Sequence, residues 1–212
     1  MNAWAWICGL PGVMRGVREA DASAEPVEQF SRWFALAKRA RIYQPNAFSL
    51  ATCAGGAPSS RMLLLKGFDA RGFVFFTNYE SRKGEELAAN PQGAMLFFWS
   101  ELHRQVRIEG RLARVTPEES SAYFHSRPRG SQLGAWASAQ SRPLDARETL
   151  MRREREYEKR YEGQTVPLPP YWGGFRLAPT RVEFWQGRPY RLHDRLVYTR
   201  ESAGWRVERL YP

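Results

Sequence analysis

The chain has 212 residues, 43% of them hydrophobic, and carries a formal net charge of +10 at pH 7. That hydrophobic content excludes a chain disordered by composition, and the length fits one large domain or two small ones. The basic balance is typical of proteins with anionic partners, namely nucleic acid, acidic membranes or phosphorylated small molecules. A solvated basic surface is the alternative explanation.

Cysteine usage and the N-terminus bear on the compartment. The two cysteines, Cys8 and Cys53, form neither a metal-ligand spacing nor a disulfide framework, which favours a reducing, cytoplasmic setting. The three histidines are scattered along the sequence, which argues against a zinc site. Residues 1–13 are apolar but lack a basic leading region and are too short to span a bilayer. We therefore expect a soluble chain with no metal and no membrane segment.

The first predicted element is a helix that follows an N-terminal arm. Apolar residues recur at helical spacing from Pro26 to about Ile42, with the proline at the helix start. We expect residues 1–23 to form a flexible arm and residues 24–212 to form a single domain.

Short strands with tight turns dominate the rest of the chain, and Ala54-Gly55-Gly56-Ala57 is a hairpin signal between the first two strands. The predicted strands are Ala47–Cys53, Ser59–Phe68, Gly72–Asn78, Gly93–Ser100, Arg104–Val115, Phe175–Phe184, Arg191–Arg200 and Trp205–Leu210. The predicted helices are Ser81–Asn90, Pro117–His125, Gln132–Ser138 and Asp145–Glu162. The fold class is therefore mainly β with α, an antiparallel β-barrel with helices packed outside, and not a parallel doubly wound sheet.

The strand segment Arg61–Lys66 carries a cation on each face. Alternation places Arg61, Leu63 and Leu65 on one face and Met62, Leu64 and Lys66 on the other. Two strand-end charges that reach solvent would give the same pattern, so this segment alone does not decide between a surface and a site.

The segment Thr77–Lys83 places two cations at the start of a predicted helix. Ser81 is a candidate N-cap, and Arg82 and Lys83 follow it in the first turn, where the helix dipole disfavours positive charge. A phosphate at the helix N-terminus would reverse that penalty. Glu85 and Glu86 offer local compensation as the alternative. The misplaced cations favour an anion site.

Two further segments gather polar groups near predicted helix and strand ends. Tyr123, Arg127 and the predicted N-cap hydroxyl of Ser131 are candidates to surround a second phosphate, and Gln140-Ser141 follows the same helix. In the predicted strand Arg191–Arg200, the residues Arg191, His193 and Arg195 would share one face, which favours an anionic or electron-rich partner. Trp185 is a candidate to stack on a ring. The basic helix at 152–160 is interpreted as a self-compensated solvated face and only a weak nucleic-acid signal.

Together these segments resemble the pyridoxine/pyridoxamine 5'-phosphate oxidase family. The resemblance rests on SRMLLLKGF, FFTNYESRKGEEL, FHSRPRGSQLGAWASAQS, VPLPPYWGGFR and EFWQGRPYRLHDR, and it covers roughly residues 24–212. It implies an FMN-binding split β-barrel that forms a homodimer with two flavin sites at the subunit interface. It also implies oxidation of pyridoxine or pyridoxamine 5'-phosphate to pyridoxal 5'-phosphate, with O2 as acceptor and H2O2 as product.

The resemblance also implies residue roles. Contacts to FMN fall on Arg61, Met62, Leu63, Leu64, Leu65, Lys66, Phe76, Thr77, Arg82, Lys83 and Gln105, and from the partner subunit's side on Gln140, Ser141, Trp185 and Arg195. Contacts to the phosphorylated substrate fall on Lys66, Tyr123, Arg127, Ser131, Arg191, Leu192 and His193. Arg191 and His193 are the implied catalytic pair, lying against the pyridine ring to orient the carbon that loses hydride.

One stretch departs from the family, and two other functions stay open. The family's N-terminal arm carries an Arg-x-x-Tyr-like motif over the substrate, whereas the stretch Gly9–Arg18 has no tyrosine. Lid closure therefore uses other residues, or the N-terminus has diverged. One alternative function is a split-barrel flavin oxidase that acts on another substrate, such as a phenazine precursor. The other is a non-catalytic binder of flavin or nucleic acid, although the sequence favours neither a nucleic-acid partner nor a membrane.

Overall fold

The structure is a computed structural model that describes residues 16–212. Residues 1–15 of the predicted N-terminal arm, which include Cys8, lie outside the described residues. The described part begins with a 3-10 helix, η1 (Glu19–Asp21), which lies beside the last strand.

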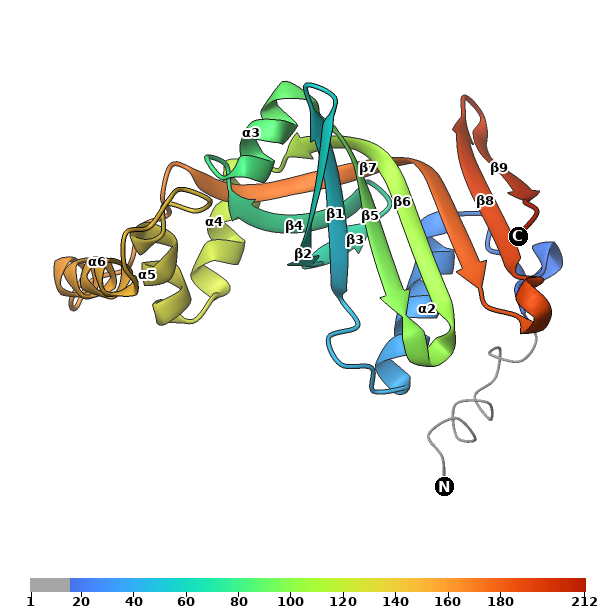
Figure 1. The fold of residues 1–212 in the computed structure, drawn as a ribbon, viewed down its shortest axis with the longest axis horizontal. Helices are drawn as coiled ribbons and strands as arrows, with labels where there is room; N and C mark the ends of the chain where they lie inside the picture. Colours follow the sequence, from blue (N-terminus) through green and yellow to red (C-terminus); the bar gives the residue numbers. More distant parts are fainter. Residues whose placement is uncertain (1–15) are drawn as a thin grey trace.

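An antiparallel sheet forms the body of the described chain (Figure 1). Its strands are β1 (Ala47–Ala54), β2 (Ala57–Leu64), β3 (Gly67–Asp69), β4 (Gly72–Asn78), β5 (Gln92–Trp99), β6 (Arg104–Arg114), β7 (Trp172–Gln186), β8 (Asp194–Glu201) and β9 (Gly204–Arg209). The strand order is β2-β1-β5-β6-β7-β4-β3, and β8 adds to β7 and β9 to β8. The predicted mainly β, antiparallel fold with accompanying helices is confirmed.

Within residues 16–212, five α-helices and two further 3-10 helices accompany the sheet. They are α2 (Pro26–Arg39), α3 (Arg82–Ala89), α4 (Pro117–Ser126), α5 (Arg129–Ala137), α6 (Arg147–Arg160), η2 (Ser100–Leu102) and η3 (Pro189–Arg191). No helix in residues 16–212 is long and apolar enough to cross a membrane.

The hairpin between β1 and β2 forms where the sequence predicts it. Ala54 pairs with Ala57, so Gly55 and Gly56 alone make the turn. Both glycines have positive φ, +57° and +79°, which is the requirement of a two-residue type I′ turn whose twist matches the flanking strands.

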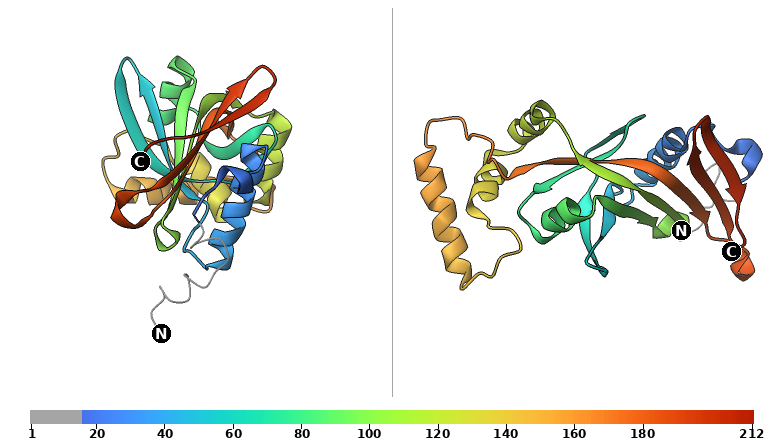
Figure 2. Two further views of the ribbon diagram at one scale, coloured as in Figure 1. Left: turned by 90° about the vertical axis from the view of Figure 1, so that its right-hand side faces the viewer. Right: turned by 90° about the horizontal axis from the view of Figure 1, so that it is seen from above.

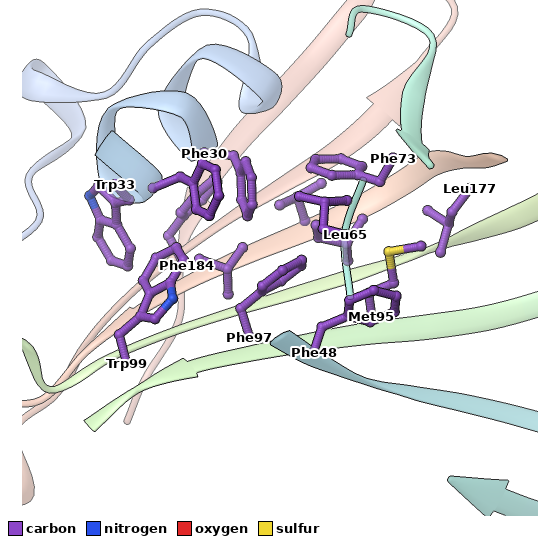
Figure 3. Packing of buried hydrophobic residues seen from close by; sticks show 14 of the residues in the cluster. Phe30, Trp33, Phe48, Leu65, Phe73, Met95, Phe97, Trp99, Leu177 and Phe184 are labelled. Carbon is purple, nitrogen blue, oxygen red and sulfur yellow. The ribbon is translucent and has the colours of Figure 1, made fainter. Parts of the chain in front are cut away.

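An aromatic core fixes α2 against the sheet. Phe30 on α2 is fully buried and makes edge-on contacts with Phe73 at 4.9 Å and Phe97 at 5.0 Å between ring centroids. Trp33, one helical turn further on, contacts Phe184 at 5.3 Å. Figure 3 shows these side chains of α2 pointing into the space enclosed by the strands. Burial of such large rings is the main stabilising contribution here.

The predicted strand Ser59–Phe68 is wrong in one respect, because the structure divides it into β2 and β3. The chain changes partners at the break: the Leu65 N–H donates to Asn46 O at 2.8 Å, and the Lys66 N–H donates to Val74 O at 2.9 Å. Leu65 is buried and Lys66 is exposed. The strict alternation of faces therefore ends at this point.

Strand β7 spans the molecule from end to end. Its first half pairs with β4 and its last residues pair with β8, while β6 runs beside most of its length. At about 3.3 Å per residue, Trp172 and Trp185 lie up to roughly 40 Å apart. Figure 1 and the right-hand view of Figure 2 place α5 and α6 at one end of the molecule and β8 and β9 at the other.

Candidate active site

A cavity of about 580 Å³ lies where α4 and α5 meet β4 and the β2–β3 break. That volume is within the range of small-molecule sites, roughly 300–1,000 Å³. Its lining residues are Leu63, Lys66, Phe76, Thr77, Asn78, Tyr123, Arg127, Pro128, Ser131, Gly134, Ala135, Ser138, Gln140 and Trp172. The structure thus brings together all four side chains that were predicted to hold a substrate phosphate, namely Lys66, Tyr123, Arg127 and Ser131.

Three parallel rings form one wall of this cavity. Phe76 of β4 stacks on Tyr123 of α4, with 4.0 Å between centroids and 19° between ring planes. Trp172, the first residue of β7, lies 5.6 Å from Phe76 and is inclined by only 11°. A wall of flat, parallel rings suits a flat aromatic ligand.

Two cations border this wall. The Lys66 ammonium lies 5.8 Å from the Tyr123 ring centroid, and the Arg127 guanidinium lies 4.7 Å from a Trp172 ring centroid. Burial lowers the pKa of Arg127, and Tyr123 opposes that shift. Arg127 Nη1 is buried and has no hydrogen-bond partner among residues 16–212. A buried cationic donor without a partner is costly unless a ligand satisfies it.

The described cavity lining contains no aspartate or glutamate. Lys66 and Arg127 therefore give it a positive charge that no lining carboxylate offsets, and an anion is the complementary ligand.

Ser131 lines the cavity, but not as the predicted helix N-cap. Helix α5 begins earlier, at Arg129, with Pro128 at the N-cap, so Ser131 lies in the first turn. Its N–H donates to Pro128 O at 2.8 Å. The proline, whose fixed φ suits a helix start, sets this earlier beginning.

A buried ammonium lies at the edge of the cavity. Lys83 Nζ donates to Gln140 Oε1 at 2.7 Å, to Ser81 Oγ at 3.0 Å and to Thr77 Oγ1 at 3.1 Å. Burial lowers the pKa of Lys83 to about 8; Arg61 lowers it further and Glu86 opposes. Because all three acceptors are neutral, Lys83 keeps an unbalanced charge beside two residues that line the cavity.

Gln140 and Ser141 follow α5 within the same chain. Gln140 hydrogen-bonds to Lys83 and Thr77, so the structure places it beside predicted flavin-binding residues of its own chain. That it reaches FMN from the partner subunit's side stays a prediction. The adjoining Ser141 has φ +70°, a conformation that non-glycine residues adopt infrequently.

Helix α3 begins with the predicted Ser81 N-cap. Glu86, one of the two acidic residues offered as local compensation, offsets positive charge there. Ser81 Oγ accepts the Gly84 N–H at 3.4 Å. Arg82 pairs with Glu86 at 2.9 Å, and Arg61 reaches the same carboxylate at 2.8 Å. Glu86 is therefore shared by two guanidinium groups, on β2 and on α3.

The apolar members of the segment from Arg61 to Lys66 face different surroundings. Leu63 lines the cavity, Leu65 is buried in the core, Leu64 is partly buried and Met62 is 66% exposed. Leu63 is the only one of these four residues that lines the cavity together with Lys66.

The remaining predicted site residues lie at the other end of the sheet, where β7 pairs with β8. The His193 ring lies 4.6 Å from Trp185, and its Nδ1 is 3.1 Å from the Arg188 backbone N. Arg195 Nε donates to Glu183 Oε1 at 2.8 Å. Gln105 of β6 pairs with Trp185 in the β6–β7 register, so it belongs to the same end.

The predicted common face of Arg191, His193 and Arg195 is wrong. Strand β8 begins only at Asp194; Arg191 ends η3, and Leu192 and His193 form the link between them. Tyr190 and Arg191 have φ of +58° and +63°. Two consecutive non-glycine residues in the left-handed region interrupt extended backbone there, so β8 starts only after them. Arg191 and Leu192 are exposed, the latter at 69%.

Two residues at or near the cavity were not predicted as site residues. Trp172 completes the ring wall, and Glu86 joins Arg61 to Arg82. The aromatic-rich PYWGGF segment was the available signal for Trp172. Glu86 had a signal too, since it follows Arg82 by four residues, but its contact with Arg61 depends on how α3 packs on β2.

Comparisons with known proteins agree with this geometry. The family described as "Pyridoxamine 5'-phosphate oxidase" matches residues 35–161, and "Pyridoxine 5'-phosphate oxidase C-terminal dimerisation region" matches residues 172–212. A pyridoxine/pyridoxamine 5'-phosphate oxidase of Rubrobacter xylanophilus is 60% identical over 93% of this chain and 91% of its own. One from Cupriavidus taiwanensis is 56% identical over 94% and 95%.

Two solved structures share the fold. PhzG from Burkholderia lata, in complex with tetrahydrophenazine-1-carboxylic acid, has a TM-score of 0.87 and 33% identity, covering 96% of this chain and 97% of its own. A pyridoxamine 5'-phosphate oxidase-related, FMN binding protein from Nostoc punctiforme has a TM-score of 0.71 at 17% identity, covering 90% of this chain and 100% of its own. Fold and family match therefore define a split-barrel oxidoreductase.

Within that class, the chain belongs to the pyridoxine/pyridoxamine 5'-phosphate oxidase family.

Proposed function

We propose that this chain is an FMN-dependent oxidase that converts pyridoxine 5'-phosphate and pyridoxamine 5'-phosphate to pyridoxal 5'-phosphate, with O2 as acceptor and H2O2 as product. The observation that carries the substrate class is the cavity that joins Lys66 and the unpartnered Arg127 Nη1 to a wall of parallel rings, without a lining carboxylate. A phosphate suits the two cations, and a flat pyridine suits the rings.

The residues beside the cavity fit an FMN phosphate. Arg61, Arg82 and Lys83 supply three positive charges, and Glu86 removes one, which leaves a net charge of +2. A phosphate monoester carries roughly −1.5 to −2 at pH 7. In this proposal Lys83 and Arg61 hold the FMN phosphate, while Lys66, Tyr123, Arg127 and Ser131 hold the substrate phosphate.

The protein's contribution to the reaction is placement and charge. A bound flavin would supply the redox chemistry between the substrate carbon and O2. The cations of this chain hold the substrate by its phosphate and so fix where its reacting carbon lies, and the rings restrict the tilt of the pyridine. Arg191 and His193 orient that carbon from the other face, as positioning groups rather than as an obligatory general base.

We further propose that the complete site combines two subunits. Within one chain, the cavity and the loop that carries Arg191 and His193 lie at opposite ends of β7. One substrate can reach both sets only if a second chain supplies the loop. The family match to a C-terminal dimerisation region over residues 172–212, which include this loop, supports a homodimer.

A second substrate is favoured by one observation. The structural similarity to PhzG, whose bound ligand carries a carboxylate, means that Lys66 and Arg127 also suit a carboxylated tricyclic substrate. The relatives at 56–60% identity favour the phosphorylated vitamer.

Turnover under air decides between these substrates. We expect peroxide and pyridoxal 5'-phosphate from pyridoxine 5'-phosphate or pyridoxamine 5'-phosphate, and much slower oxidation of unphosphorylated pyridoxine. In Arg127→Ala, the KM for the phosphorylated substrate should rise about 10- to 100-fold, the loss of one charge-assisted hydrogen bond, while oxidation of pyridoxine stays unchanged. Peroxide only with a dihydrophenazine carboxylate would replace the proposed function by the second one.

A further inference from the structure

We infer that Glu86 is a positioning residue for the flavin phosphate: it holds the Arg61 and Arg82 guanidinium groups together before the cofactor binds. This inference rests on the proposed function, because it assigns the phosphate of FMN to the cluster formed by Arg61, Arg82 and Lys83. Glu86 itself would not touch the cofactor.

The Glu86 carboxylate is buried, and both of its oxygens accept hydrogen bonds. Its residue is 8% exposed. Oε2 accepts from Thr52 Oγ1 at 2.5 Å and from Arg61 Nη2 at 2.8 Å, and Oε1 accepts from Arg82 Nε at 2.9 Å. The Ser59 hydroxyl lies 2.8 Å and 2.7 Å from the two oxygens. Because a carboxylate has about four acceptor positions, these donors saturate it.

The donors come from three different elements. Thr52 and Ser59 face each other across the β1–β2 ladder, Arg61 lies two residues further along β2, and Arg82 is the first residue of α3. Glu86 thus fastens the start of α3 to the β1–β2 hairpin through charge-assisted bonds, which are about twice as strong as neutral ones.

Arg61 depends on this carboxylate for its orientation. Its guanidinium reaches Thr52 Oγ1 at 2.6 Å, Ser59 Oγ at 2.5 Å and Glu86 at 2.8 Å. Only the last of these partners is charged. Arg61 also repels the buried Lys83 ammonium, as its lowering of the Lys83 pKa records. Without Glu86, three like charges would share this corner of the molecule, held by neutral partners alone in the part of the chain that the structure describes.

Replacement by glutamine tests the charge with nearly the same shape. The glutamine amide has only one acceptor oxygen. In Glu86→Gln the NH2 group therefore faces N–H and O–H donors whose hydrogen bonds the second carboxylate oxygen accepts in the wild type. Arg61 then loses its charged partner and turns away from the phosphate position.

The test is titration of the flavin-free full chain with FMN and with riboflavin, which has the same ring but no phosphate. In Glu86→Gln we expect the Kd for FMN to rise tenfold or more and the Kd for riboflavin to stay unchanged. Glu85→Gln is the matched control: it removes the same charge from the neighbouring position on α3, where the side chain is 52% exposed and pairs with Arg142. That control should leave both constants unchanged.

The outcomes separate the inference from the proposed function. A wild-type chain that binds FMN no more tightly than riboflavin would contradict the phosphate assignment, and with it the proposed function. A wild-type preference for FMN that Glu86→Gln retains or strengthens would overturn only the role of Glu86. Equal loss of FMN and riboflavin binding would also overturn it, because a damaged fold affects both. Should Glu86→Gln fail to fold, Ser59→Ala removes one donor and should weaken FMN binding alone, by a smaller factor.

Discussion

At the scale of residues, the site separates its charges into two groups with different surroundings. Lys66 and Arg127 border the cavity without a carboxylate in its lining, whereas Arg61 and Arg82 share the Glu86 carboxylate. The first group is open to a ligand that arrives and leaves with each turnover. The second group is held in place by permanent partners, which suits a cofactor that stays bound.

Lys83 gives a pH-dependent prediction. Burial lowers the pKa of its ammonium group to about 8 in the flavin-free chain, and a nearby phosphate would raise that pKa again. Below about pH 8 Lys83 is already charged, so the Kd for FMN should be flat down to the second phosphate pKa near 6. Above about pH 8, FMN binding must take up a proton, and the Kd should rise toward tenfold per pH unit.

The measurement is the Kd for FMN across this pH range, with Lys83→Met as the comparison. The variant should bind FMN more weakly at pH 7 and should lose the rise above pH 8. A wild-type Kd that stays flat up to pH 10 would show that the phosphate does not reach Lys83.

At the scale of elements, the sequence patterns predict the regular parts well and the joints poorly. The alternation over β6 and the helical spacing over α2 predict the structure closely, because each pattern depends on one element facing one core. The paired glycines at 55–56 also predict their turn, because positive φ at two positions requires them.

The errors lie where tertiary partners change. The break between β2 and β3 occurs because Lys66 pairs with β4 after Leu65 has paired beside β1, and a single-strand pattern does not contain that exchange. Likewise, the left-handed pair Tyr190 and Arg191 delays β8 until Asp194. Three of the six described non-glycine residues with positive φ, Ser141, Tyr190 and Arg191, lie within or next to predicted ligand positions, where strained backbone concentrates in proteins.

Motif resemblance found site residues that periodicity alone left undecided. Lys66 is far in sequence from Tyr123, Arg127 and Ser131, yet all four line one cavity. Trp172 and Glu86 were missed because their roles come from packing: one lies flat beside Phe76, and the other receives Arg61 from a different element.

At the scale of the whole molecule, the long strand β7 separates the two halves of the proposed site. Trp172 lies at the ring wall, and Trp185 lies beside His193 up to roughly 40 Å away. A two-fold relation between two copies would bring the cavity of each chain to the loop of the other. This arrangement predicts that neither chain works alone.

Complementation between two impaired variants tests that arrangement. Arg127→Ala damages the cavity end and Arg191→Ala damages the loop end, so each homodimer should turn over slowly at substrate concentrations near the wild-type KM. When the two are unfolded together and refolded as a mixture, half of the dimers carry one of each chain, and each such dimer has one intact site. Activity should return to about a quarter of the wild-type value. Activity that stays at the level of the separate variants would mean that both ends act within one chain.

The central claim is that a flavin bound by this chain oxidises a phosphorylated pyridine, and the most direct measurement is the visible spectrum of the yellow protein without oxygen. Addition of pyridoxine 5'-phosphate should bleach the flavin absorbance rapidly, admission of air should restore it, and the same amount of pyridoxine should bleach it far more slowly. A flavin that stays oxidised with pyridoxine 5'-phosphate and with pyridoxamine 5'-phosphate would contradict the claim.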